Sequence, residues 1–499
     1  MNNGKICVSV CAETANEMTE QIKRAEKLAD LVELRFDCLK KEEFDKLNYN
    51  FPCNRKWIFT FRPKEQGGKK TLSLEEREEF WNSGNDFCGG DFEEDVVENH
   101  LYWLYDPIIC SYHDFNGVPD NLVQIYERIK NAEASVDVIK IAVQTKDITD
   151  TIPMWKLLER AKSENKQIIP IAMGEAGKWT RILGLAHGAF MTYASLDAGR
   201  ETAPGQVSVT DLIEVYRAKE LDEQTDIYGI IGGNTSYSMS PYMHNAAFKS
   251  ANLNSVFVPL QVSDLDEFIK RIVKPETREI ELNFKGFSVT NPHKQNIIKH
   301  LDDIDETAQK IGAVNTVKII DGKLYGYNTD AGGFIEPLKN AYGDLNGAKV
   351  AVFGAGGAAR ACVYALTQEN ADVTVFARDV ERAKALADEF KVNSSKFKVQ
   401  DENYGEFDVL VNAMPLGTKG KLENLSIAKA EQIKGVNLIY DLVYNPFQTR
   451  LMSEADSVHV PKIGGMAMLV AQGAEQFRIW TGKSAPIREM SAAALRKLG

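Results

Sequence analysis

Four short apolar runs near the start of the chain carry ionisable side chains that could act together on a ketone. Glu33 and Arg35 alternate in one run and therefore share a strand face, Arg62 follows a second run, His113 lies in a third, and Lys140 interrupts a fourth. Burial removes the hydration of an ammonium group, so Lys140 is expected to have a lowered pKa and to offer a neutral amine. Such an amine forms an imine with a ketone, and His113 could then remove a neighbouring proton and protonate a leaving hydroxyl. These residues predict imine-assisted elimination of water.

Arginine side chains accompany these groups and suggest an anionic substrate. Arg35, Arg62 and Arg181 could clamp a carboxylate through paired hydrogen bonds. For any single charged strand residue, a structural ion pair is an equally good explanation. Four such strands in one domain favour an active site instead.

A glycine-rich turn in the second half has the pattern of a dinucleotide site. The run Gly354-Ala-Gly-Gly-Ala-Ala lies between an expected strand, Ala348–Phe353, and an expected helix, which is the context that GxGxxA requires. The glycines allow close approach of a pyrophosphate, and the helix N-terminus favours its charge. After the next expected strand comes Arg378, which favours NADP over NAD although Asp379 follows it. The predicted cofactor-binding residues are Gly354, Ala355, Gly356, Gly357, Ala358 and Arg378.

Hydroxyl and amide side chains gather in motifs upstream of this turn, around Ser238 and Ser240, Thr290, Asn315 and the stretch 326–330. Serines could bind a carboxylate, while Asn and Thr could bind ring hydroxyls. Lys294 could give a proton to a carbonyl oxygen as a hydride arrives, and Asp330 could orient Lys294. Each motif alone is also ordinary turn chemistry. Together they predict reduction of a polyhydroxylated ring that carries a carboxylate.

Alternating β-branched runs and helix-like segments must position these groups, and this alternation is typical of parallel strands covered by crossover helices. The front part contains seven clear strands, and an eighth is needed near Phe87–Glu93, where the pattern is weak. The clear strands are Lys5–Ala12, Leu31–Asp37, Trp57–Arg62, Pro107–Asp114, Val138–Thr145, Ile168–Met173 and Phe190–Ser195. Eight strand–helix units within about 220 residues match a closed (β/α)8 barrel, whose chemistry lies at the C-terminal ends of the strands.

The composition restricts the partners. The chain has 499 residues and a formal net charge of −12, which disfavours nucleic acid and anionic membranes. No apolar stretch approaches the roughly 20 residues of a membrane span, and the N-terminus has no signal core, so we expect a cytoplasmic chain, plastidic only if a leader was removed. The seven cysteines show neither CxxC nor metal spacing. They are predicted to be reduced thiols, with Cys7, Cys11, Cys53 and Cys110 filling the core, and no metal site or oligomer is implied.

With its motifs in order, the front part resembles type I 3-dehydroquinate dehydratase over about residues 5–220. The motifs are Glu33-Leu-Arg35, Thr60-Phe-Arg62-Pro, Ser111-Tyr-His113-Asp-Phe, Val138-Ile-Lys140-Ile-Ala and Ala203-Pro-Gly-Gln206. The resemblance implies that Lys140 forms a Schiff base with 3-dehydroquinate, that His113 is the general acid and base, and that Glu33 supports His113. It also implies a substrate site of Arg35, Arg62, Met173, Arg181, Thr202 and Gln206. One departure is Gln66, where the family usually has Glu; Glu65 is adjacent.

Residues from about 226 to 490 resemble shikimate dehydrogenase, including Tyr440-Asp-Leu-Val-Tyr444-Asn-Pro and Gly464-Gly-Met-Ala-Met-Leu-Val-Ala-Gln472. The resemblance implies Lys294 and Asp330 as the catalytic pair and adds Gly465 to the cofactor site. The implied substrate residues are Ser238, Ser240, Thr290, Asn315, Tyr444 and Gln472. Two departures are Tyr237, where His is usual, and Met414-Pro415, where Thr-Ser is common.

Four regions follow from these resemblances: the barrel, 1–222; a substrate-binding domain, 226–332; an NADP-binding Rossmann domain, 333–460; and C-terminal helices, 461–499, that pack back on the substrate-binding domain. The order is that of plant-type bifunctional enzymes, in which the dehydratase makes the 3-dehydroshikimate that the dehydrogenase reduces to shikimate. One alternative is a second half that oxidises quinate or shikimate with NAD. Another is a non-catalytic sensor, which would be expected to have lost Lys140, His113 or Lys294.

Overall fold

The chain forms two compact units in a computed structural model that describes residues 2–44, 46, 56–82, 89–99, 106–132, 136–396 and 403–498. One unit comprises residues 1–227 with 233–237 and 254–284, and the other comprises 228–232, 238–253 and 285–499. Among the described helices, none combines the length and the apolar composition that crossing a bilayer requires.

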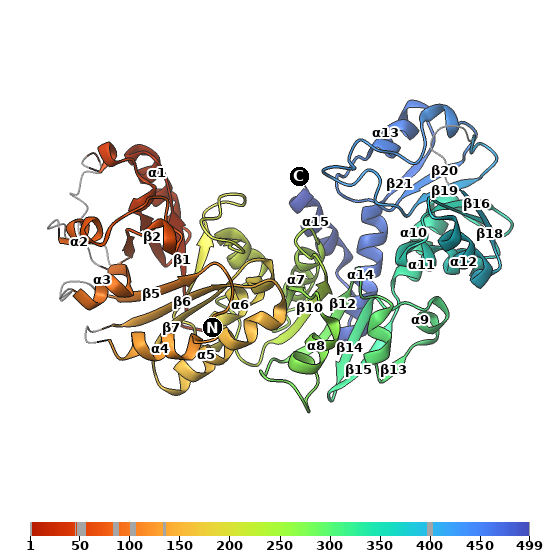
Figure 1. Cartoon of the computed structure of the whole chain (residues 1–499). Helices are drawn as coiled ribbons and strands as arrows, with labels where there is room; N and C mark the ends of the chain where they lie inside the picture. Colours follow the sequence, from red (N-terminus) through yellow and green to blue (C-terminus); the bar gives the residue numbers. More distant parts are fainter. Residues whose placement is uncertain are drawn as a thin grey trace. The chain divides into compact units, whose positions relative to one another are not determined.

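The first unit is built on parallel strands that curl into a barrel, which confirms the predicted fold class (Figure 1). Their hydrogen-bonded order is β7-β6-β5-β4-β3-β2-β1-β8-β9. The backbone N–H of Phe190, just before β8, also donates to the carbonyl of Ile168 in β7 at 2.9 Å. The strands are β1 (Lys5–Val10), β2 (Leu31–Arg35), β3 (Trp57–Thr60), β4 (Gly89–Glu93), β5 (Ile108–Asp114), β6 (Val138–Gln144), β7 (Gln167–Met173), β8 (Met191–Ser195) and β9 (Val207–Ser208). The weak eighth strand expected near Phe87–Glu93 is therefore β4.

Helices cover the outside of this barrel because each has one apolar face. In α1, for example, Met18 and Ile22 are buried one turn apart, and Thr14 caps the first turn by accepting from the N–H of Glu17. Inside the barrel, alternate residues of the strands, such as Cys7, Ile109 and Ile169, form one apolar cluster. The helices are α1 (Ala15–Ala25), α2 (Leu74–Asn82), α3 (Glu94–Asn99), α4 (Leu122–Lys130), α5 (Ile152–Ser163) and α6 (Lys178–Leu183).

One pair of cysteines contradicts the prediction of reduced thiols. Cys11, directly after β1, and Cys38, at the end of the 3-10 turn Phe36–Cys38 after β2, form a disulfide with their Cα atoms 5.4 Å apart. The two lie 27 residues apart in the sequence but meet because β1 and β2 are parallel neighbours that end at the same edge. Cys7 and Cys110 are buried and lie outside the disulfide, as predicted, and Cys53 lies outside the described residues.

A six-stranded mixed sheet, in the order β11-β10-β12-β14-β15-β13, follows the barrel in the sequence. Its strands are β10 (Asp226–Gly232), β11 (Ser255–Gln261), β12 (Phe284–Val289), β13 (Asp303–Ile304), β14 (Thr316–Ile320) and β15 (Lys323–Tyr327). Its helices are α7 (Ser240–Ser250), α8 (Leu265–Phe268) and α9 (Glu306–Ile311).

A parallel sheet of order β18-β17-β16-β19-β20-β21 completes the second unit. Numbered from its own first strand this is 3-2-1-4-5-6, the doubly wound order of dinucleotide-binding domains. The strands are β16 (Lys349–Phe353), β17 (Asp372–Ala377), β18 (Asn393–Lys396), β19 (Val409–Asn412), β20 (Leu438–Asp441) and β21 (Lys462–Gly464). The helices are α10 (Asp330–Tyr342), α11 (Gly357–Gln368), α12 (Val380–Phe390), α13 (Arg450–Ser457), α14 (Gly465–Thr481) and α15 (Ile487–Leu498). Helix α14 contacts α10, α7 and β14, and α15 contacts α7.

Candidate active sites

A pocket of about 420 Å³ in the first unit brings all the residues predicted for the dehydratase site together. They come from barrel strands or from the segments that follow them: Lys140 is the third residue of β6, and Arg181 lies on α6, which follows β7. The predicted residues that line the pocket are Glu33, Arg35, Arg62, His113, Lys140, Met173, Arg181, Thr202 and Gln206.

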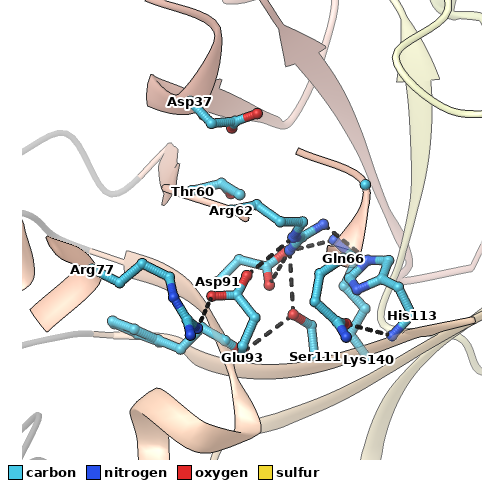
Figure 2. A network of polar contacts seen from close by, with 12 residues as sticks. Asp37, Thr60, Arg62, Gln66, Arg77, Asp91, Glu93, Ser111, His113 and Lys140 are labelled. Atoms are coloured by element: carbon cyan, nitrogen blue, oxygen red, sulfur yellow. Dashed lines mark hydrogen bonds and ion pairs between the residues drawn. The ribbon is translucent and has the colours of Figure 1, made fainter. Parts of the chain in front are cut away.

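Lys140 is buried in this pocket, with 3% of its surface exposed. Its Nζ lies 2.5 Å from Oδ2 of Asp91, 3.8 Å from Oε1 of Glu33 and 4.1 Å from the ring centre of Tyr193 (Figure 2 shows Lys140 and Asp91). Burial and the positive charge of Arg62 lower the pKa of Lys140, while the two carboxylates oppose that shift. The amine is therefore easier to deprotonate than an ordinary lysine.

Arg62 faces the imidazole of His113, and this contact defines the state of the imidazole. NH1 of Arg62 lies 2.9 Å from Nε2 of His113. Because a guanidinium can only donate, Nε2 must accept, and the proton of the neutral ring lies on Nδ1. Burial, reinforced by the charge of Arg62, lowers the pKa of His113 well below its ordinary value. His113 is thus a neutral base at physiological pH.

Arg181 differs from the other two arginines in having uncommitted donors. Its Nε and NH1 are buried without a hydrogen-bond partner among the described residues, and burial lowers the pKa of Arg181 to about 10. By contrast, Asp37 accepts from Nε and NH2 of Arg35 at 2.8 Å each, and Asp91 pairs with Arg62 at 2.6 Å. Of the three predicted clamp residues, Arg181 is the one left to neutralise an incoming carboxylate.

Sequence reasoning missed two buried carboxylates on β4. Asp91 contacts Lys140 and Arg62, and Glu93 contacts Arg62 and Arg77 (Figure 2). Although burial opposes it, Arg62 and Lys140 hold the pKa of Asp91 far below its usual range. The missed signal was the alternation Asp91-Phe92-Glu93, which places both carboxylates on one strand face as in Glu33-Leu34-Arg35.

Gln66, which replaces the Glu usual in the family, contacts the strand that carries His113. Its Oε1 accepts a hydrogen bond from the backbone N–H of His113 at 2.9 Å, so the amide ties the loop after β3 to the strand that carries His113. The two glycines that follow are needed for this turn. Gly67 has a φ of +86°, and a Cβ on Gly68 would lie 1.8 Å from the carbonyl oxygen of Arg62.

In the second unit, Lys294 and Asp330 form the core of a separate site. Nζ of Lys294 lies 2.5 Å from Oδ2 of Asp330. Nδ2 of Asn315 donates to the other carboxylate oxygen at 2.8 Å and to the hydroxyl of Thr329 at 2.9 Å. Asp330 is the first residue of α10, where the helix N-terminus stabilises a negative charge. These contacts fix the position of the Lys294 ammonium group, the predicted proton donor.

Gln472 reaches this group from α14. The hydroxyl of Thr329 lies 3.5 Å from Oε1 of Gln472. The helices α10 and α14 touch closely here, since a Cβ on Gly333 would lie 2.7 Å from the backbone nitrogen of Gln472. One turn further along α14, Gln476 donates to the carbonyl of Asn315 and accepts from the hydroxyl of Ser288.

The glycine turn after β16 fits a dinucleotide. Gly354 has a φ of +131°, and a Cβ on Gly356 would meet no atom within 4 Å, so the backbone is open to a ligand. Gly356 is the N-cap of α11 and has no side chain to occupy the free N–H groups of that helix. A Cβ on Gly357 would lie 3.4 Å from Cδ of Lys294, which places the turn beside the proton donor. Arg378 is exposed directly after β17, where it was expected.

The remaining predicted residues lie on neighbouring elements. Ser238 accepts from the N–H of Ser240 at the start of α7, Thr290 follows β12, and Tyr444 lies between β20 and α13. The roles of these four residues in substrate binding stay predictions. Gly465 begins α14, where a Cβ would lie 2.2 Å from the carbonyl of Leu442.

The departure at Met414 is explained by packing. This side chain is 8% exposed and belongs to the apolar cluster that includes Phe353 and Phe376, beneath the nucleotide-binding sheet. Among the described residues, no group of three His, Cys, Asp or Glu side chains is arranged to hold a metal ion.

The fold and the two sites define a parallel α/β barrel with a buried lysine in its pocket, joined to a dinucleotide-binding unit, and comparisons with known proteins agree. Family models match for type I 3-dehydroquinase over residues 6–223, the shikimate dehydrogenase substrate-binding domain over 230–317, shikimate/quinate 5-dehydrogenase over 336–442, and the shikimate 5′-dehydrogenase C-terminal domain over 465–495. The chloroplastic bifunctional 3-dehydroquinate dehydratase/shikimate dehydrogenase of Arabidopsis thaliana is 34% identical over 97% of this chain and 83% of its own length.

Two further relatives match the second half. The shikimate dehydrogenase (NADP(+)) of Methanocaldococcus jannaschii is 40% identical over 56% of this chain and 99% of its own length. A crystal structure of a shikimate dehydrogenase in complex with NADP+ has a TM-score of 0.51 and 38% identity, covering 56% of this chain and 98% of that one. The chain belongs to the family of bifunctional 3-dehydroquinate dehydratase/shikimate dehydrogenases.

Proposed function

We propose that the barrel site dehydrates 3-dehydroquinate through an imine on Lys140, and that the second site reduces the resulting 3-dehydroshikimate to shikimate with NADPH. The observation that carries this proposal is the pairing, in one pocket, of a buried amine of lowered pKa with Arg181, a buried cation that has unpartnered N–H groups. A substrate with both a ketone and a carboxylate satisfies both groups.

The first reaction begins when the neutral amine of Lys140 adds to the ring ketone and water leaves to form the iminium. The iminium draws electrons from the adjacent C–H bond, and the neutral His113 removes that proton. The electron pair forms the new carbon–carbon double bond as the ring hydroxyl leaves, and protonated His113 supplies the proton that makes it water. Hydrolysis of the imine then releases 3-dehydroshikimate and restores the Lys140 amine.

In the second reaction, the chain's residues bind the substrate and deliver a proton. NADPH, when bound along the Gly354–Ala358 turn with its 2′-phosphate near Arg378, supplies the hydride. Lys294 donates a proton to the carbonyl oxygen of 3-dehydroshikimate, and Asp330 fixes the direction of its N–H bonds. Asn315 and Gln472 are predicted to hold the substrate, and Ser238 and Ser240 are the predicted carboxylate ligands.

Two single substitutions test the assignment, because each reaction controls for the other. Lys140→Ala should abolish dehydration and leave reduction of 3-dehydroshikimate near normal, whereas Lys294→Ala should do the reverse. Borohydride added with 3-dehydroquinate should reduce the imine and add mass to the peptide that contains Lys140. Loss of both activities in either variant, or a wild-type chain that borohydride leaves unmodified, would contradict the two-site proposal.

A coupled assay addresses the complete sequence and the alternative substrate. Addition of 3-dehydroquinate and then NADPH should yield shikimate, and we expect a shorter lag than with the separated halves because the second site is at a raised effective concentration. An equal lag would argue against this advantage of fusion. Activity with quinate and NAD exceeding that with shikimate and NADP would instead support the alternative assignment of the second half.

The predicted cytoplasmic location stays a prediction. The Cys11–Cys38 disulfide is a feature more usual of oxidising compartments, so the redox state of this pair in the cell bears directly on it.

A further inference from the structure

A chain of alternating basic and acidic side chains runs from helix α2 to the imidazole of the dehydratase site, and burial together with the charge of Asp91 raises the pKa of the Glu93 carboxyl to about 7. Arg77 on α2 contacts Glu93 on β4, Glu93 contacts Arg62, and Arg62 faces His113 (Figure 2). The side chains of Arg77, Glu93 and Arg62 are only 4–7% exposed. At the outer end, Asp95 accepts from Arg77 at 2.8 and 2.5 Å, and its side chain is 51% exposed.

The geometry points to Glu93 and Arg77 as positioning residues that fix the direction in which Arg62 presents NH1 to His113. A guanidinium is a rigid planar fork, so holding two of its nitrogens sets the direction of the third. Glu93 accepts from Nε of Arg62 at 3.3 Å, the hydroxyl of Ser111 accepts from NH2 at 3.2 Å, and Asp91 forms an ion pair with NH2 at 2.6 Å. NH1 is then directed at Nε2 of His113.

Arg77 gives Glu93 a fixed orientation in turn. The two oxygens of Glu93 are divided between the two arginines, Oε1 to Arg62 and Oε2 to Arg77 at 3.2 Å. An amide at this position offers only one acceptor oxygen, so it can satisfy only one of the two guanidinium groups. Neither Glu93 nor Arg77 is needed in direct contact with the substrate, and both would act through Arg62.

Stability alone does not account for this chain of charges. Buried ion pairs lose much of their attraction to desolvation, and apolar residues of similar size often replace them without cost. Orientation of a base does require such groups, because the NH1 donor keeps Nε2 of His113 unprotonated before the reaction, and Nε2 is the nitrogen that takes the substrate proton once this contact is released. Charged groups that face His113 also include Lys140 on β6, Asp91 on β4 and Arg35 on β2, and they remain in place when Glu93 is changed.

The test separates the step that uses His113 from the step that uses Lys140, and it rests on the proposed roles of both. In Glu93→Gln, dehydratase kcat should fall about tenfold, the effect expected for loss of one charge-assisted hydrogen bond. The imine trapped by borohydride on Lys140 should reach at least the wild-type level, because elimination is slowed after the imine has formed. Arg77→Met should give the same pattern, and the double variant should be no worse than the poorer single variant.

Controls make each outcome decisive. Glu79→Gln changes an exposed carboxylate on the same helix as Arg77 and should leave both readouts unchanged. The inference is overturned if kcat stays within twofold of wild type in Glu93→Gln and Arg77→Met, or if kcat and imine trapping fall together, which would indicate a collapsed pocket. His113→Ala distinguishes failure of this inference from failure of the proposed function, because full dehydratase activity in that variant would refute the proposed role of His113 itself.

Discussion

Replacing Asp91 with Asn is expected to make Lys140 more reactive as an amine even though it removes a partner. The Asp91 carboxylate, 2.5 Å from Nζ, stabilises the ammonium form, whereas burial and Arg62 disfavour it. A hydrogen bond between charged groups contributes about 1.5–3 kcal/mol. Its loss should therefore raise the fraction of neutral Lys140 below its pKa by between about tenfold and a hundredfold. The pKa of Lys140 moves down, so the gain is largest on the acid side.

Competitive acetylation measures this directly. Wild type and Asp91→Asn are treated with trace acetic anhydride from pH 6 to 9, and labelling of Lys140 is compared by peptide mass spectrometry with labelling of Lys27, which is exposed. Asp95→Asn is the matched control, because it neutralises a carboxylate that contacts Arg77 and not Lys140. An unchanged or lower Lys140-to-Lys27 ratio in Asp91→Asn would refute the reasoning. Turnover should nevertheless fall, because Asp91 also holds Arg62.

Two further predictions concern the scaffold. The disulfide closes a loop of 27 residues, so the double variant Cys11→Ser/Cys38→Ser should lose roughly 3.5 kcal/mol of barrel stability, measured by urea unfolding with dehydratase activity as the signal. Reductant should lower the unfolding midpoint of the wild type only. Rapid alkylation of Cys11 or Cys38 without reductant would contradict the pairing. Gly333→Ala should force α10 and α14 apart at a cost of about 1–3 kcal/mol and raise the KM for 3-dehydroshikimate. Gly332→Ala is the control and should have neither effect, because its added Cβ meets no atom within 4 Å. Equal kinetics in the two variants would show that the close approach of the helices is unimportant.

The barrel could be predicted from sequence because its strands are short, apolar and interrupted or followed by ionisable residues. Lys140 stood out since no local feature explains an ammonium in a run of Val and Ile. Asp91 and Glu93 were not predicted because β4 is short and begins with two glycines, so its apolar pattern is weak. Their roles depend on Arg62 and Lys140, which come from other strands and meet them only in the closed sheet.

The cysteine pair shows a different limit. Spacing and composition favoured reduced thiols, and nothing local distinguishes Cys11 and Cys38 from Cys7 and Cys110. Their proximity follows from the parallel pairing of β1 with β2, a tertiary relation that the spacing of 27 residues does not reveal. In the second unit the order of motifs located Lys294 and Asp330, whereas the contribution of Gln476 became visible only when α14 was placed against β14.

The contact between α14 and α10 has a consequence for the order in which the two activities arise on the ribosome. Gln206 is the last residue in the sequence that lines the barrel pocket, so the barrel site can assemble while most of the reductase is still untranslated. Gln472 and Gln476, which contact Thr329 and Asn315 of the second site, emerge close to the end of synthesis. A nascent chain released prematurely, after the barrel but before α14, would accordingly release a keto product that it cannot itself reduce.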